Sequence, residues 1–257
     1  MNRSTAKLAI VATVIAAVTL GLLNVPGPGG RSAVVWAQAA PQAGTAPGFV
    51  WHTKTTQTNV AWEQPRESRR ITYWCAKHGV RTDDHPDDPP AVTTYVNYDD
   101  GTQVILFHPM KWYAQRSLPP QPPGAEAGRE ADAWRKATIN QFMSGAYKKL
   151  GRQTIAGEEA DGVEVQNPAG FGGNFQIDSV TAQLWVSVKT GYPVLIQEDV
   201  IGNNWTLQIK TVKDQFQWDV QFDPNEFKAV IPPDYQLVYL DPQQGVVVPP
   251  SADQKSH

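Results

Sequence analysis

Alternation of hydrophobic and polar side chains is the feature that most constrains how this chain can fold. In residues 216–222, FQWDVQF, every second position is hydrophobic, and these positions are Phe216, Trp218, Val220 and Phe222. A period of two places successive side chains on opposite faces of a β-strand. The segment therefore predicts a strand with one hydrophobic face, which we expect to point inward because an exposed stripe of this kind is unusual.

Similar strand signals occur in many other segments of the chain. They lie at residues 49–62, 70–77, 91–98, 104–107, 111–117, 152–166, 180–200, 205–210 and, as a last edge strand, 235–248. The Asp100-Gly101 pair and Gly191 are suited to tight turns, so they predict two of the hairpins. Short links between such segments indicate antiparallel pairing.

One segment changes the period from two to about 3.6 residues, which is typical of an amphipathic helix. It spans residues 128–150, and we expect it to end before Gly151. Its hydrophobic stripe consists of Ile139, Phe142, Met143, Ala146, Tyr147 and Leu150. Strands on both sides of one helix predict an α+β fold, in which a curled antiparallel sheet forms an incomplete (half-open) β-barrel with a helix across its concave face.

The N-terminus has the pattern of an export signal. Arg3 and Lys7 precede a hydrophobic run at 8–23, and AQA at 37–39 fits a cleavage site before Ala40. The run is shorter than the roughly 20 residues that span a bilayer, although an uncleaved N-terminal membrane anchor is the alternative. We expect a signal peptide at 1–39, a disordered leader at 40–48, one domain at 49–240, a C-terminal tail at 241–257, and a periplasmic or secreted protein.

Composition argues against several classes of function. Three of the 22 basic residues and none of the acidic ones lie in the signal segment, so the exported part has 19 basic and 25 acidic residues, a net charge of −6. An acidic chain without basic clusters predicts no nucleic-acid partner. Cys75 is the single cysteine, which excludes an intramolecular disulfide and favours a role as a small buried hydrophobic residue.

No motif points to catalysis or to metal binding. The sequence contains neither a G-x-S-x-G nor an H-E-x-x-H motif. The best metal candidate is the acidic run DDHPDD at residues 83–88, but it lacks the Gly and the terminal Glu of a calcium loop, and its prolines favour a solvated turn. We predict no catalytic residues, no metal and no cofactor.

Aromatic residues are the one excess in the composition. The exported part holds eight of the nine Trp, together with eight Tyr and eight Phe. Aromatic side chains are favoured in strands, where they form core, but a curled sheet can also display them in a hydrophobic hollow. We expect core where the helix touches the sheet and a ligand pocket elsewhere. The predicted ligand-binding residues are Phe216, Trp218, Val220, Phe222, Phe142 and Met143.

Three segments carry a resemblance to a known family. They are LWVSVKTGYPV at 184–194, FDPNEF at 222–227 and IPPDY at 231–235. The first is similar to the W-V-x-x-x-T-G-x-P-V hairpin of outer-membrane lipoprotein-sorting proteins, a group within the periplasmic lipoprotein-carrier (LolA/LolB-like) superfamily. The resemblance covers about residues 49–240.

The resemblance implies a half-open β-barrel and a non-catalytic function. The implied ligands are lipid or lipoprotein acyl chains, held in the hollow for lipoprotein sorting to the outer membrane, and a membrane receptor or regulator protein is a candidate further partner. The alternative is an envelope-stress sensor module that binds a membrane regulator protein of the anti-sigma type. No ligand contact of the family is carried over to a residue of this chain.

Overall fold

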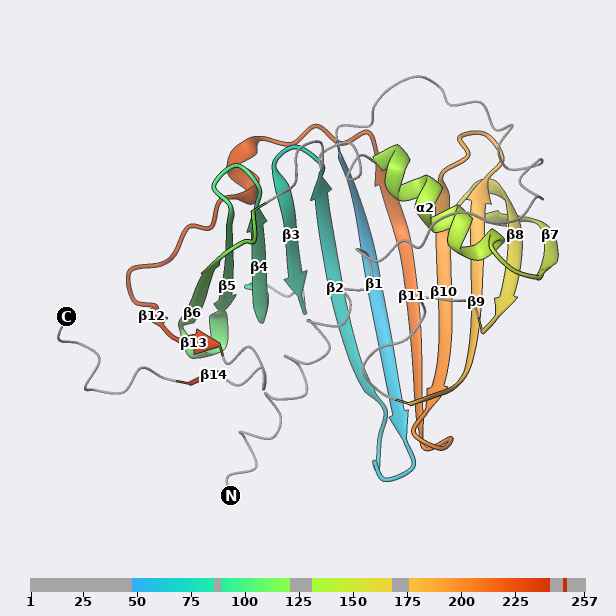
Figure 1. Cartoon of the computed structure of the whole chain (residues 1–257), viewed down its shortest axis with the longest axis horizontal. Coiled ribbons are helices and arrows are strands. Elements are labelled where there is room, and N and C mark those ends of the chain that lie inside the picture. Colours follow the sequence, from blue (N-terminus) through green and yellow to red (C-terminus); the bar gives the residue numbers. More distant parts are fainter. Residues whose placement is uncertain (1–47, 86–88, 121–130, 168–175, 241–246, 249–257) are drawn as a thin grey trace.

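The computed structural model describes residues 48–85, 89–120, 131–167, 176–240 and 247–248. A 12-stranded open sheet forms most of the protein, and one α-helix lies across one of its faces (Figure 1). We call the face that carries this helix the concave face and the other the convex face. The predicted fold class, an incomplete antiparallel barrel with a helix across it, is confirmed.

Two antiparallel meanders meet at the centre of the sheet. The first consists of β1 (Gly48–Asn59), β2 (Arg66–Cys75), β3 (Gly79–Asp84), β4 (Val92–Asn97), β5 (Thr102–Phe107) and β6 (Trp112–Ser117). The second consists of β7 (Tyr147–Ile155), β8 (Glu158–Gln166), β9 (Ile177–Ser187), β10 (Pro193–Gly202) and β11 (Leu207–Trp218). Antiparallel pairing of β1 with β11 joins them. The strand order is β12-β6-β5-β4-β3-β2-β1-β11-β10-β9-β8-β7.

The chain after β11 returns along the sheet to the far edge (Figure 1). It contains a short 3-10 helix, η2 (Pro224–Phe227), and β12 (Gln236–Leu237), which pairs in parallel with β6. β13 (Tyr239–Leu240) and β14 (Val247–Val248) form a separate small pair, so the single last strand predicted at 235–248 is divided into short pieces. A second 3-10 helix, η1 (His108–Met110), precedes β6.

The α-helix is shorter than predicted. α2 spans Ala131–Met143, whereas the hydrophobic stripe predicted a helix as far as residue 150. The Ser144 hydroxyl donates to the carbonyl oxygen of Gln141 at 3.0 Å, and Gly145, a poor helix former, follows at once. The helix therefore ends about two turns before the predicted stop, and the chain enters β7.

A bulge in β7 explains why this error arose. Gly151 adopts φ = 82° and the register with β8 shifts between Lys149 and Gly151, so this glycine serves a strand irregularity and not a helix end. A spacing of three residues between Tyr147 and Leu150 suits one face of a helix, but in β7 the two side chains lie on opposite faces: Tyr147 packs against the main core and Leu150 points to the convex side.

The segment at 216–222 is a strand only in its first half. β11 ends at Trp218, and Asp219 adopts φ = 62°, which breaks the alternation. Beyond this turn, the Phe222 ring packs edge-on against Tyr73 at 6.5 Å. Tyr73 lies on the convex face, since its neighbour in β2 points to the concave side. The expectation of one shared strand face for Phe216, Trp218, Val220 and Phe222 is therefore wrong.

A second bulge decides which side chains of β11 face the helix. Gln215 adopts φ = 52°, and the register with β1 shifts between Val50 and His52. Without the extra residue, Phe216 would share a face with Asp214, two positions earlier. The bulge moves Phe216 to the concave face, where it joins the main hydrophobic core.

The main core fills the space between α2 and the sheet. It combines Phe49 and Trp51 of β1 and Trp134 and Phe142 of α2 with side chains of β8, β9 and β10. Cys75 is also buried, as predicted. Among the described residues, none of the helices has the length and hydrophobicity that crossing a bilayer would need.

Candidate ligand-binding site

Stacked aromatic rings dominate the concave face beneath α2. The Phe49 ring stacks on Trp51 with centroids 5.2 Å apart and on Trp218 at 4.7 Å. The ring centroid of Trp134, a residue of α2, lies 5.1 Å from that of Phe49. Within β11, Phe216 stacks on Trp218 with centroids 5.5 Å apart. Alternation along β1 and β11 supplies the sheet side of this cluster, and the helix supplies the cover.

Not all of the cluster is closed off from solvent. Six hydrophobic side chains pack against the buried core while remaining partly exposed, and we call them the aromatic ledge: Trp74, Ile139, Met143, Tyr147, Phe216 and Trp218. They come from β2, α2, β7 and β11, which the open sheet brings together along the helix. A ledge of half-buried rings beside a helix offers hydrophobic area to a ligand without exposing the core.

The structure brings together some of the predicted site residues and separates others. Phe216, Trp218 and Met143 are members of the ledge. Phe142 is 1% exposed and belongs to the closed core. Val220 and Phe222 lie past the end of β11: the Val220 N–H donates to the carbonyl oxygen of Gly48 at 3.0 Å, and Phe222 packs on the convex face.

Trp218 is held firmly in its place on the ledge. Its indole N–H donates to the carbonyl oxygen of Pro193 at 3.2 Å, and its ring stacks on Tyr192 at 4.6 Å. Burial raises the pKa of the Tyr192 hydroxyl, and the nearby Asp219 carboxylate adds to this, so Tyr192 stays neutral. The β9–β10 turn thus clamps one end of the ledge.

A buried arginine ties α2 to the same turn. Arg135 is 7% exposed. Its guanidinium carbon lies 5.4 Å from the Tyr192 ring centroid, and its Nη1 donates to the Gly191 carbonyl oxygen at 3.4 Å. Its Nε donates to Asp132 Oδ1 at 3.0 Å. Burial raises the pKa of the Asp132 carboxyl, but hydrogen bonds from Lys136 and Arg135 outweigh it, and the pKa is lowered.

Sequence reasoning missed Trp134, Arg135 and Tyr192 as parts of the site. Trp134 lies eight residues before Phe142, close to two helical turns, so a stripe extended toward the N-terminus would have included it. Arg135 and Tyr192 carry no such signal, because their contact depends on how the helix crosses the sheet.

Away from the helix, the concave face becomes polar. The hydroxyls of Thr55 and Thr211 lie 3.5 Å apart on neighbouring strands. Nζ of Lys213 lies 2.8 Å from the Glu198 carboxylate, at partly buried positions. Since Lys213 pairs opposite Thr53 on the same face, the hydrophobic hollow predicted for the whole inner face is restricted to its helix end.

The acidic run at 83–88 divides between strand and loop. Asp83 and Asp84 belong to β3, a strand that the sequence did not predict, and residues 86–88 lie outside the described residues. Asp84 accepts from Arg70 Nη2 at 3.2 Å, and Asp83 accepts from Arg81 Nη2 at 2.7 Å. The solvated turn expected here is therefore wrong for these two buried carboxylates, which form ion pairs.

His108, a side chain that could take part in acid–base chemistry, is held in hydrogen-bond contacts within the fold. His108 Nδ1 lies 2.8 Å from the Tyr235 hydroxyl, and its Nε2 lies 3.1 Å from the Thr93 hydroxyl. Burial lowers the pKa of His108, and the smaller opposing effect of Asp83 does not reverse this. Within the described ranges, no three His, Cys, Asp or Glu side chains are grouped as a metal site requires.

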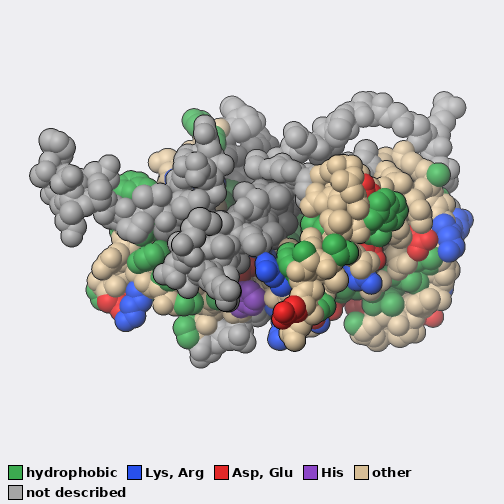
Figure 2. Space-filling model, turned by 90° about the horizontal axis from the view of Figure 1, so that it is seen from below, with side chains coloured by type: hydrophobic (Ala, Val, Ile, Leu, Met, Phe, Trp, Pro, Cys, Tyr) green, Lys and Arg blue, Asp and Glu red, His purple; other side chains and the backbone are tan. Residues whose placement is uncertain are grey.

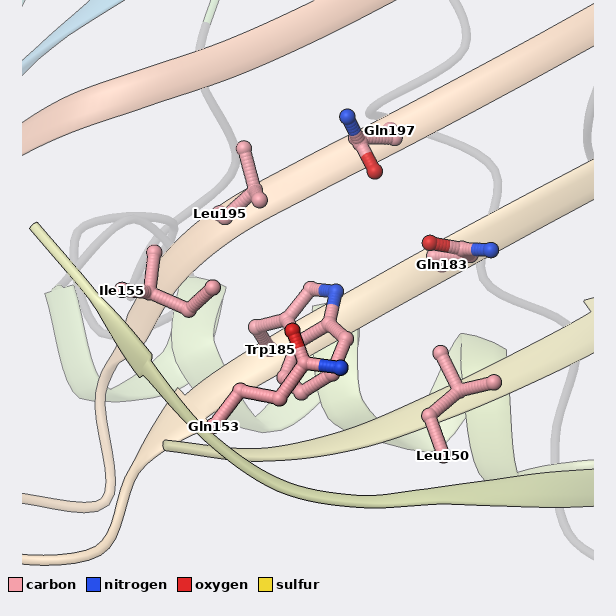
Figure 3. A pocket seen from close by; sticks show the side chains of 7 residues that line it. All are labelled: Leu150, Gln153, Ile155, Gln183, Trp185, Leu195 and Gln197. Carbon is pink, nitrogen blue, oxygen red and sulfur yellow. The ribbon is translucent and has the colours of Figure 1, made fainter. Parts of the chain in front are cut away.

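A groove of about 300 Å³ lies on the convex face, not at the ledge. Its lining, seen in Figure 3, is Leu150, Gln153, Ile155, Gln183, Trp185, Leu195 and Gln197. Leu195 pairs opposite Trp185, and both alternate with core side chains, so they point away from α2 (Figure 3). Trp185 lies over Gly162, where any Cβ would come within 2.6 Å of the indole.

Comparison with known proteins gives matches in structure and none in sequence. No family model matches the chain, and neither does any curated protein. The architecture is similar to that of LolA superfamily structures. A LolA superfamily protein from Nitrosomonas europaea is 10% identical, with 72% of this chain and 91% of that chain covered and a TM-score of 0.34.

Two further structures show the same degree of similarity. A domain described as an outer membrane lipoprotein-sorting protein, from Vibrio parahaemolyticus, is 10% identical over 73% of this chain and 91% of that chain, with a TM-score of 0.31. The lipoprotein LppX of Mycobacterium tuberculosis is 12% identical, with 68% of this chain and 88% of that chain covered and a TM-score of 0.39.

Proposed function

We propose that this chain is an exported, non-catalytic protein that binds a hydrophobic ligand, namely lipid or lipoprotein acyl chains, along the aromatic ledge. The observation that carries the proposal is the ledge itself. Its six side chains are packed against a closed core yet remain partly exposed beside α2. Apolar area that a ligand covers there leaves water at roughly 25 cal/mol per Å².

The layout of the concave face favours an acyl chain over a larger hydrophobic partner. Hydrophobic side chains are gathered along the helix, and the face turns polar toward Thr55, Thr211 and the Lys213–Glu198 pair. A narrow ligand can lie along the ledge with its polar end toward these groups. Lipoprotein sorting to the outer membrane is the task that we assign to such binding.

Native mass spectrometry of protein purified from its own envelope tests the proposal. We expect a bound species with the mass of a lipid or an acylated peptide, and saturable one-to-one binding of a fluorescent fatty-acyl probe after delipidation. Folded, delipidated protein that shows no saturable probe binding would contradict lipid binding. Copurification of a membrane regulator protein without lipid would instead support the envelope-stress sensor.

A further inference from the structure

Two hairpin tips lie side by side at the end of the sheet away from α2 (Figure 1). The β1–β2 tip carries Val60 and Trp62, and the β10–β11 tip carries Trp205. The Val60 N–H donates to the carbonyl oxygen of Thr206 at 3.0 Å, which ties the two tips together. Val60 is 79% exposed and Trp205 is 66% exposed, although both side chains are hydrophobic.

The backbone of the second tip fixes Trp205 in this exposed position. Asn203, Asn204 and Trp205 adopt φ angles of 55°, 56° and 64°, a left-handed run that is rare for a residue as bulky as Trp. The Trp205 N–H donates to Asp178 Oδ2 at 2.8 Å, and the Asn203 N–H donates to the Gln176 carbonyl oxygen at 2.9 Å. The turn therefore displays the indole and does not bury it.

The size and charge of this surface favour a lipid bilayer over a protein partner. Two or three side chains cover far less than the roughly 800 Å² per partner of a stable protein interface, but they suffice to enter a membrane surface. The charges nearby include both signs: Glu63 and Arg66 lie in the β1–β2 tip, and further along the hairpin Lys54 Nζ lies 2.8 Å from Glu67 Oε1. Arg66 stacks 4.0 Å above the Trp62 ring, and Trp and Arg both favour the membrane–water interface.

We propose that the tip surface, Val60, Trp62 and Trp205, inserts into the interfacial region of a lipid bilayer and docks the protein on a membrane. Figure 2 views the molecule from this end and shows basic, acidic and hydrophobic side chains interspersed on the described surface. Because the local charges are balanced, insertion depends on hydrophobic area and not on anionic lipid. The proposal goes beyond ligand binding at the ledge, and either can fail without the other.

Sedimentation with phosphatidylcholine vesicles tests the docking, with the protein as purified from the envelope. The double variant V60S/W205A should bind at least about tenfold more weakly than the unchanged protein, because it loses most of the exposed apolar area. W205F should retain most of the binding. V230S is the matched control, since Val230 is 82% exposed elsewhere on the surface, and it should bind normally.

Several outcomes would overturn the proposal. Vesicle binding that V60S/W205A leaves unchanged, or that V230S reduces equally, would mean that the tips do not insert. Binding that requires phosphatidylglycerol and disappears at high salt would indicate charge attraction instead. If the unchanged protein sediments as a dimer and W205A as a monomer, the tips join two copies and do not dock on lipid. Acyl-probe binding should be the same in all variants, which separates this test from that of the ledge.

Discussion

At the scale of single residues, Trp218 is the side chain whose role the structure defines most closely. Its ring stacks on Phe49, Phe216 and Tyr192, and its indole N–H is bonded to Pro193. It is therefore both part of the fold and part of the ledge. A substitution there should affect stability and ligand binding together.

We predict that Trp218→Ala lowers the free energy of unfolding by about 3 kcal/mol and weakens acyl-probe binding about tenfold. Phe222→Ala is the matched control, because Phe222 packs on Tyr73 and Phe227 on the convex face. It should cost a comparable amount of stability and leave probe affinity unchanged. Chemical denaturation and probe titration measure the two quantities. Equal losses of affinity in both variants would contradict a ledge site.

We expect His108 to make the stability of the fold depend on pH. Burial lowers its pKa in the folded protein, so the folded state resists a proton that the unfolded chain accepts once the pH falls below about 6.5. The folded state should therefore lose stability as the pH falls through that value. We predict that the melting temperature drops less in His108→Gln than in the unchanged protein between about pH 7.5 and pH 5.5. Equal drops would assign the pH dependence to other groups.

At the scale of elements, α2 depends on its anchor to the β9–β10 turn. Arg135 contacts both the Gly191 carbonyl and the Tyr192 ring, while Asp132 retains Lys136 as a second partner. Loss of Arg135 should therefore loosen the helix without unfolding the sheet.

We predict that Arg135→Ala costs about 2 kcal/mol, through lost hydrogen bonds and lost packing of the arginine stem. Hydrogen exchange should become faster in α2 than in the central strands. Lys136→Ala is the control: Lys136 pairs with the same Asp132 but is 65% exposed, so its loss should cost less than about 1 kcal/mol. Uniformly faster exchange over the whole sheet in Arg135→Ala would contradict a specific anchor.

The same elements show how far sequence reasoning reaches. Strand alternation predicted most of the sheet, because the side chains that point to the concave face pack in the core, as in β8 and β10. It failed at Gln215 and Asp219, where non-glycine residues adopt positive φ with no sequence signature. It also missed β3, which carries ion pairs where a strand signal would need hydrophobic side chains: Asp84 pairs with Arg70 of β2, and Asp83 pairs with Arg81 within β3 itself.

At the scale of the whole molecule, the candidate site was only partly predictable. Phe216, Trp218 and Met143 were expected beside the helix and lie there. The polar part of the concave face was not expected. Thr55 lies on this face together with Lys213. The bulge in β11 turns Lys213 to this face by shifting the alternation, and the sequence does not show the bulge. The boundaries of the signal peptide, leader and tail stay predictions, since residues 1–47, 241–246 and 249–257 lie outside the described residues.

We place the ligand on the concave ledge and not in the convex groove. Photocrosslinking with a diazirine-labelled fatty acid, followed by peptide mapping, tests it most directly. We expect labels on the peptides that carry Trp74, Met143 and Phe216, and we expect unlabelled fatty acid to compete with the labelling. Labels concentrated on the groove peptides around Gln153 and Leu195, or labelling that unlabelled fatty acid does not reduce, would contradict it.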